Sequence, residues 1–362
     1  MTEVTAPPVV EKEKREWFSP LTRKKIHRFT QIKRGYYAFW VFMLLIVLSA
    51  AAELIVNNKA LIVKYEGSLY FPTYSDVIGG DFFGLDYPYE TNYRELSEKF
   101  SNDGSNNWVL LPLVPWNAFE QDFLDGEYPP YAPSAERKHY LGTDSIGRDI
   151  VARLVYGFRI AIIFAMFSLF ICMGIGVSVG CAMGYFGRWI DLVGQRVIEI
   201  LSVVPFLYVI MVFASIVKPG LFWLTVVYVM FGWMGITWYM RSMTYKEKAR
   251  DYVMSARAIG ASHARIIFHH ILPNTIVMVI TIAPFFMVAG ISVLTALDYL
   301  GFGLRPPTPS IGELLQQGKA NLDSPWIVWS AILSVSTILV LIQFIGEAVR
   351  EAFDPKRYTR YE

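Results

Sequence analysis

Charged residues are scarce in this 362-residue chain. Asp, Glu, Lys and Arg make up only 18% of the residues, whereas 54% are hydrophobic and the mean hydropathy is +0.37. Soluble domains carry about 25% charged residues. The formal net charge is only +2. This composition excludes a disordered chain, a basic nucleic-acid-binding domain and an ordinary cytosolic enzyme.

Cysteines and recognisable catalytic motifs are also few. Cys172 and Cys181 are nine residues apart in one apolar run, which on a helix is about 13 Å and too far for a disulfide. The string 312–320 has the wrong spacing for a Walker loop. The adjacent His269 and His270 would point about 100° apart on a helix, a poor arrangement for a metal. We therefore expect no catalytic residue, no metal site and no cofactor bound by this chain.

Long stretches without charge dominate the rest of the sequence. A helix of about 20 apolar residues crosses a membrane, and lipid leaves helices as the only option at this length. We predict an all-α membrane protein. A further uncharged stretch, 104–119, contains Pro112 and Pro115 and predicts a surface loop instead. The six predicted transmembrane helices are 36–56, 160–185, 196–217, 223–242, 275–297 and 325–347.

The distribution of Lys and Arg predicts the orientation. Residues 1–35 hold nine basic residues, whereas 57–157 hold eight against fifteen acidic ones, a net charge of −7. Because basic residues favour the cytoplasmic side, we place both termini in the cytoplasm and the acidic segment outside. The predicted parts are a basic segment 1–35, a first transmembrane helix 36–56, an irregular acidic insert 57–157, a five-helix core 158–347 and a tail 348–362.

Two features of the helices bear on how such a protein would work. Gly176, Gly180 and Gly184 share one helix face, which predicts a close contact with another helix; this contact either slides during a conformational cycle or is simply tightly packed.

Acidic residues within or beside the spans all lie near their ends. Since ion-coupled transporters usually need ionisable groups near the midplane, an ion-coupled secondary transporter is the disfavoured alternative. We instead favour a transporter that receives its energy from a partner subunit.

The cytoplasmic loop 243–274 is the candidate receiver of that energy. Residues 251–259 favour a helix, Gly260 favours a break, and Ser262 is suited to cap the next helix. We expect two short helices joined at a glycine between the fourth and fifth spans. Ala256 and Ala258 are small enough for the first helix to enter a groove on another protein.

Residues 251–274 resemble the EAA loop of ABC-importer permeases. Ala256, Gly260, Ala261, Pro273 and Asn274 match the family pattern, while Met254 and Ser255 stand where the family has glutamate and alanine. Other strings resemble the permeases of dipeptide and oligopeptide importers, in particular those of the microcin C/peptide type. These strings are 141–149, 153–157, 184–187 with Asp191, 298–303, 306–310, Gly318, Pro325–Trp326, 345–350 and 354–356.

The resemblance implies a permease subunit of an ABC importer in the bacterial inner membrane, with 57–157 periplasmic. Its cargo would be peptides, including peptide antibiotics such as microcin C, and ATP hydrolysis on partner subunits would drive it through residues 251–265. The implied partners are a second, different permease, two ATP-binding domains on separate chains or one fused chain, a periplasmic substrate-binding protein, the peptide and membrane lipid, with no nucleic acid. ATP and Mg would bind those partners. The alternative within the family is a dipeptide or nickel importer permease.

The candidate site residues fall into three groups. The predicted path lining is aromatic or methionine-rich, although packing against lipid or a neighbouring residue is the favoured explanation for each of its members. The acidic insert either docks the binding protein or is a plain solvated surface. The ATPase interface is Asp251, Tyr252, Met254, Ala256, Arg257, Gly260, Ala261, Ser262 and Arg265; the junction with the fifth span is Pro273 and Asn274; the path is Phe206, Tyr208, Met211, Phe285, Phe286 and Met287.

Overall fold

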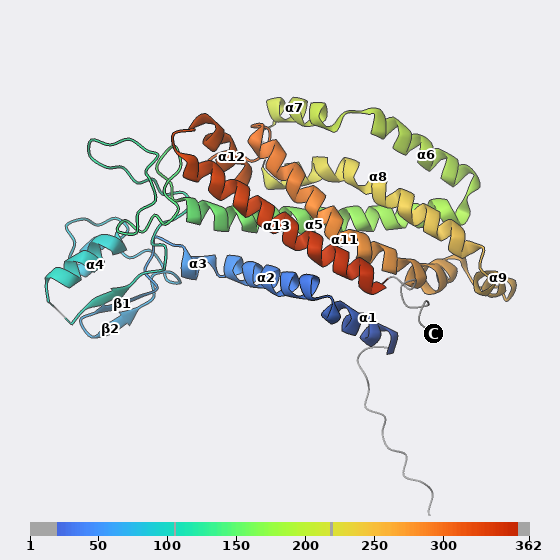
Figure 1. The fold of residues 1–362 in the computed structure, drawn as a ribbon, viewed down its shortest axis with the longest axis horizontal. Coiled ribbons are helices and arrows are strands. Elements are labelled where there is room, and N and C mark those ends of the chain that lie inside the picture. The colour runs from blue at the N-terminus through green and yellow to red at the C-terminus, as the bar shows by residue number, and fades with distance from the viewer. Residues whose placement is uncertain (1–19, 105, 218–219, 354–362) are drawn as a thin grey trace, which may run out of the picture.

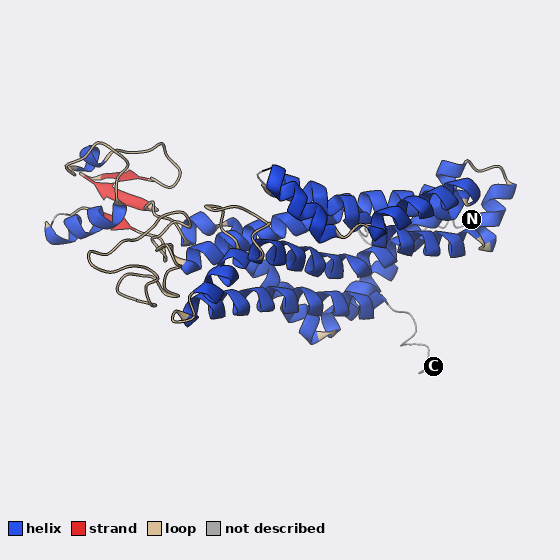
Figure 2. Ribbon diagram, turned by 90° about the horizontal axis from the view of Figure 1, so that it is seen from above, coloured by secondary structure: helices blue, strands red, loops and turns tan. Residues whose placement is uncertain are grey.

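The computed structural model describes residues 20–353 except 105, 218 and 219. The molecule is elongated: long helices lie side by side, a small lobe with strands occupies one end, and α9 lies at the opposite end (Figures 1 and 2). Most of the predicted basic segment and the tail string 354–356 lie outside the described residues. The helices are α1 (Pro20–Gln31), α2 (Lys33–Ala50), α3 (Ala52–Ile55), α4 (Tyr93–Asn102), α5 (Ile150–Phe186), α6 (Arg188–Val203), α7 (Phe206–Ile216), α8 (Leu221–Lys248), α9 (Asp251–Ala258), α10 (His263–Arg265), α11 (Leu272–Tyr299), α12 (Ile311–Ala320) and α13 (Pro325–Phe353).

Five helices in the described part of the chain are long and apolar enough to cross a membrane, in line with the predicted class. The single straight span predicted at 196–217 is wrong. The chain breaks between α6 and α7, which are bent by 69° and together make one further span at most. Val204 is extended and Pro205 follows it. Proline lacks an N–H and disfavours helical geometry in the residue before it, which explains the break.

The long helices also extend beyond the uncharged stretches. α5 begins ten residues before the predicted span, and its first turns carry Arg153 and Arg159. Both are paired: Arg153 with Glu313, and Arg159 with Glu53 at 2.7 Å. Charges at a helix end are tolerated when a partner neutralises them. The uncharged stretches are therefore shorter than the helices that contain them.

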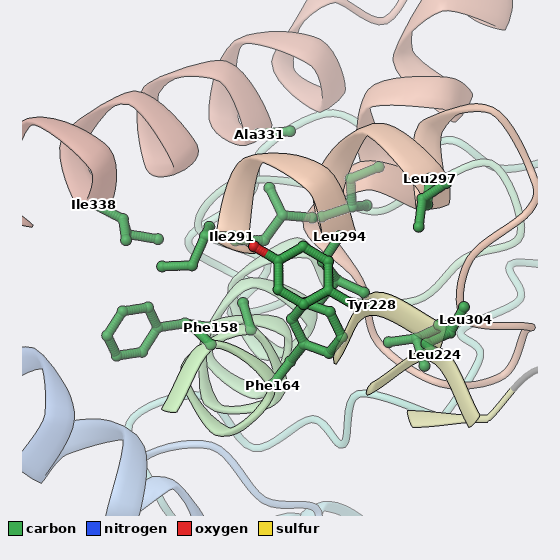
Figure 3. Packing of buried hydrophobic residues seen from close by; sticks show 14 of the residues in the cluster. Phe158, Phe164, Leu224, Tyr228, Ile291, Leu294, Leu297, Leu304, Ala331 and Ile338 are labelled. Atoms are coloured by element: carbon green, nitrogen blue, oxygen red, sulfur yellow. The ribbon is translucent and has the colours of Figure 1, made fainter. Parts of the chain in front are cut away.

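The packing centre of the bundle is α5, which lies against α8 along much of its length. A Cβ atom on Gly180 would lie 2.7 Å from both the Met240 Cβ and the Thr237 carbonyl oxygen of α8. Gly176 and Gly184 approach the same helix, so the predicted close helix contact is confirmed. Next to it Phe164 of α5 meets Tyr228 of α8, with ring centroids 5.4 Å apart, in the main buried cluster (Figure 3).

The lobe at the other end is built around a three-stranded antiparallel sheet. Its strands are β1 (Ile62–Tyr65), β2 (Ser68–Tyr70) and β3 (Trp108–Leu110), in the order β2-β1-β3. The turn residues Glu66 and Gly67 both have positive φ, as a two-residue hairpin requires. β3 lies inside 104–119, so the expectation of a plain surface loop there is wrong. The pairing of Val109 with Val63 and the packing of both against α4 explain why this short apolar run forms a strand.

Candidate coupling site and transport path

The short helix α9 is separated from the following helix by a sharp glycine turn. Gly260 has φ +82°. The Gly260 N–H donates to the Arg257 carbonyl at 3.1 Å, and the Ala261 N–H donates to the Ala256 carbonyl at 3.0 Å. The Ser262 hydroxyl accepts the Arg265 N–H. The predicted pattern of helix, glycine break and capped second helix is therefore confirmed.

An apolar contact fixes α9 to the helix bundle. Val253 and Ala256 are buried, and Val253 packs with Tyr185, Ile266 and Ile271. Tyr185 lies at the end of α5. The Ala256 side chain faces the interior of its own chain, and its small size lets α9 approach the bundle closely. The entry of this short helix into a groove on another protein stays a prediction.

Tyr185 also makes polar contacts with both halves of the loop. Its hydroxyl lies 2.8 Å from the His263 Nδ1, and the Arg257 Nη2 donates to it at 3.4 Å. The Arg257 guanidinium lies over the same ring, 5.5 Å from its centroid. One side chain from α5 thus contacts residues on both sides of the glycine turn.

The two ends of the predicted loop meet at Tyr252 and Asn274. The Asn274 Nδ2 donates to the Tyr252 hydroxyl at 3.0 Å and to the His270 carbonyl at 2.8 Å, while Tyr252 donates to the Glu247 Oε2 at 2.6 Å. Burial, followed by the hydrogen bond to Glu247, raises the pKa of Tyr252. Residues 266–271 form a π-helical turn. The side chains of Asn274 and Tyr252 both lie within hydrogen-bond distance of the His270 carbonyl in this turn.

The outer face of α9 carries two exposed apolar side chains. Met254 is 53% exposed, and Ile259, which was not among the predicted interface residues, is 86% exposed. The sequence feature that points to Ile259 is its position as an apolar residue directly before a glycine that ends a helix. The other predicted interface residues divide as follows: Asp251, Tyr252, Arg257, Gly260, Ser262 and Arg265 are exposed, and Ala261 is half-buried.

The predicted path residues do not form one lining. Phe206 and Phe286 both contact the ring of Tyr228, with centroids 6.3 and 6.1 Å away, and Met287 packs against the same buried cluster. These three side chains serve packing within the bundle. Met211 is half-buried and Tyr208 is exposed, both on α7.

Phe285 has a different environment, because it lines a groove of about 690 Å³ between α8, α11 and α13. The groove also reaches Glu247 and Asn274, the residues that hold Tyr252 of α9. Its lining combines apolar, hydroxyl and charged side chains: Tyr239, Met243, Glu247, Asn274, Thr275, Val277, Met278, Thr281, Ile282, Phe285, Arg350 and Phe353.

A buried ion-pair network lies where the lobe joins the helices. The Arg148 Nε donates to the Asp144 Oδ2 at 2.7 Å and its Nη2 to the Glu313 Oε1 at 2.8 Å, while Arg153 pairs with the other oxygen of Glu313. Burial lowers the pKa of Arg148, but the Asp144 and Glu313 carboxylates raise it on balance. Glu313 lies in the string that fails as a Walker loop, which forms α12. Sequence reasoning missed this network; its signal was two arginines, one just before and one in the first turn of a long apolar helix.

The described residues contain no group of three or more His, Cys, Asp or Glu side chains suited to a metal ion. Cys172 and Cys181 are free and buried. His269 and His270 lie in the π-helical turn, where the His270 carbonyl serves the contact with Asn274.

Comparison with known proteins identifies relatives along nearly the whole chain. A family model described as "Binding-protein-dependent transport system inner membrane component" matches residues 176–357. The "Inner membrane ABC transporter permease protein YejE" of Escherichia coli is 40% identical over 94% of this chain and 98% of its own length. The "Peptidoglycan transport system permease protein YejE" of Agrobacterium fabrum is 36% identical over 96% and 97%. The "Oligopeptide transport system permease protein OppC" of Mycobacterium tuberculosis is 32% identical over 68% and 84%.

Proposed function

This chain belongs to the family of binding-protein-dependent transport system inner membrane components, and we propose that its helix α9 transmits the movement of partner ATPase subunits to the spans. The chain is a YejE-type permease subunit of a peptide ABC importer, a non-catalytic, multi-pass component of the inner membrane. The proposal concerns how this subunit is driven, where the peptide passes and which peptide it carries.

The attachment of α9 to three elements supports the coupling role. Tyr252 of α9 bonds Glu247 of α8 and Asn274 of α11, while Arg257 bonds Tyr185 of α5. A force applied to the exposed face of α9 therefore reaches three long helices through direct contacts. ATP-driven closure of two ATP-binding domains, on separate chains or one fused chain, would move α9 as a rigid body and tilt the spans.

The exposed apolar side chains of α9 give a direct test of coupling. Ile259→Asp places a charge where we expect an apolar groove of the ATPase, whereas the side chain makes little contact within its own chain. In proteoliposomes containing the full importer, we expect ATP-driven peptide uptake to fall about tenfold or more. Tyr128→Asp, at a fully accessible position of the lobe, is the matched control and should transport normally. Wild-type uptake by the Ile259 variant would exclude this role for α9.

For the peptide path, we propose the groove beside Phe285 as its part near α9. The groove meets the size and mixed lining expected of a ligand site, and Glu247 and Asn274 connect it to α9. Phe206, Tyr208, Met211, Phe286 and Met287 remain predicted positions farther along the path.

Cysteine scanning separates these positions. Phe285→Cys should react with a water-soluble thiol reagent in the assembled importer, and excess peptide should slow the reaction. Ile291→Cys, at a fully buried position of the same helix that is not among the predicted path residues, is the control and should stay inert. The buried native cysteines set the background in unsubstituted protein. An inert Phe285→Cys would remove the groove from the path.

Two peptide classes are candidates for the cargo. Microcin C-type peptides follow from the sequence resemblance, and peptides derived from peptidoglycan are suggested by the name of the Agrobacterium relative. Uptake of a labelled tripeptide, measured against competing microcin C, a peptidoglycan peptide, a dipeptide or nickel, distinguishes them. Competition by nickel alone would favour the metal-importing alternative within the family.

We propose that both termini and α9 lie in the cytoplasm and that residues 57–157 lie in the periplasm. The lobe and α9 are at opposite ends of the molecule, which supports opposite sides of the membrane (Figure 1). The complex would also contain a second, different permease and a periplasmic binding protein, with ATP and Mg held by the ATPase subunits. Co-purification in detergent tests this composition. The orientation is tested by adding protease to spheroplasts, which should cleave the lobe but not residues 251–265.

A further inference from the structure

The sheet in the lobe has one packed face and one exposed face. Val63 and Val109 point toward α4, where they pack with Leu96 and Phe100. The alternate residues point away from α4, because side chains alternate along a strand. A solvated face of an antiparallel sheet is normally polar.

Here the solvated face is mainly apolar. Leu69 of β2 is 54% exposed, and Trp108 and Leu110 of β3 are 42% and 46% exposed. The register places Leu69 and Trp108 on either side of Lys64, and Leu110 beside Ile62. These five residues form a continuous strip across all three strands, which we call the outer sheet face. A contiguous apolar strip rimmed by polar residues is typical of an interaction surface.

The charge of the lobe restricts what covers this face. Residues 57–157 carry a net charge of −7. The hairpin turn beside the face adds the exposed Glu66, whose N–H bonds Asn107 next to Trp108. The net negative charge of the lobe, with Glu66 beside the face, disfavours an anionic lipid surface and favours a protein partner with basic residues around an apolar centre.

We infer that the outer sheet face is the docking surface for the soluble substrate-binding protein of this importer. The inference depends on the proposed function, which places the lobe in the periplasm. The family is described by its dependence on such a binding protein, and the sheet that carries the face lies at the end of the molecule opposite to α9 (Figure 1). The matching surface of the binding protein contains apolar residues ringed by Lys and Arg.

The experiment uses the complete importer in lipid nanodiscs and the purified binding protein of the same system, loaded with peptide. Trp108→Ser combined with Leu110→Ser removes the apolar centre at exposed positions. We expect the affinity for the binding protein to fall about tenfold or more, with loss of the stimulated ATPase activity. Basal ATPase activity and subunit composition should stay unchanged. Tyr128→Ser, 93% exposed elsewhere on the lobe, is the control and should behave as wild type.

The outcomes separate this inference from the proposed function. Full stimulation of the Trp108/Leu110 variant would overturn the docking assignment while leaving the importer function intact. Loss of the second permease from the purified variant would also overturn it, since the face would then contact another permease. Wild-type importer that neither binds nor responds to the binding protein would instead contradict the proposed function itself.

Discussion

The side-chain amide of Asn274 donates a hydrogen bond to the hydroxyl of Tyr252 at 3.0 Å across 22 residues of sequence. The bond joins the start of α9 to the start of α11, beside a π-helical turn whose His270 carbonyl Asn274 also satisfies. Movement of α9 and α11 is thereby linked at the base of the loop.

Removing the hydroxyl in Tyr252→Phe deletes its bonds to Glu247 and Asn274. We expect a loss of about 1 kcal/mol in stability and a lower number of peptides transported per ATP hydrolysed. Uptake and ATPase activity measured on the same proteoliposomes give this ratio. Tyr245→Phe, an exposed tyrosine on α8, should leave the ratio unchanged. An unaltered ratio in Tyr252→Phe would mean that this bond does not contribute to coupling.

Glycine is required in the turn after α9 because of its backbone conformation, and not because a side chain would collide with neighbouring atoms. Gly260 has φ +82°, and no atom lies within 4 Å of the position that a Cβ would occupy there. A Gly260→Val substitution should therefore cost about 1–2 kcal/mol through backbone strain and reduce uptake. Gly260→Asn should retain most uptake, because asparagine tolerates this region. Equal uptake by the two variants would show that the turn geometry is not required.

The contact between α5 and α8 allows no side chain at Gly180. Gly180→Leu should destabilise the protein by about 1–3 kcal/mol or separate the helices, because its Cβ would collide with Met240 and the Thr237 carbonyl. Gly174→Leu on the same helix has open space and is the matched control. Thermal unfolding in detergent measures both variants. A normal melting temperature for Gly180→Leu would contradict the close contact.

Breaking the buried ion-pair network around Glu313 should lower the free energy of unfolding. Glu313→Gln leaves Arg148 and Arg153 buried with one carboxylate fewer, and loss of one partner in such a network costs about 3–5 kcal/mol. Glu199→Gln removes a carboxylate from an exposed pair with Arg196, where we expect about 1 kcal/mol or less. Denaturant or thermal unfolding compares the two. Similar small effects would show that the network contributes little.

The lobe should lose stability in alkali through Tyr93. Burial, with a smaller effect from Glu90, raises the pKa of Tyr93 to about 12 from 10.0. The neutral phenol is therefore favoured in the folded state, so its stabilisation is complete below pH 10 and is lost as the pH rises from 10 to 12. The shift corresponds to about 2–3 kcal/mol. Tyr93→Phe should lack this loss, whereas the exposed Tyr128→Phe should keep it; tryptophan fluorescence against pH distinguishes them.

Local features of the fold were predictable from local sequence. The absence of charge located the long helices, and Gly260 with Ser262 located the turn and the cap in the loop 243–274. The bend before α7 is signalled by Pro205, but the hydropathy of the stretch 196–217 does not distinguish a bent pair of helices from one straight span. Long-range contacts were not predictable: Glu313 meets Arg148 across 165 residues, and only packing decides that Ala256 faces inward while Ile259 faces outward. β3 likewise forms because a distant strand pairs with it.

We propose that this chain is moved by ATP hydrolysis on other subunits and does not transport by itself. Peptide accumulation in proteoliposomes tests it most directly, comparing this chain alone with the complete importer and its binding protein. We predict accumulation only for the complete importer, only with ATP, and with no effect of an imposed proton or sodium gradient. Accumulation by the chain alone under any of these conditions would contradict the account.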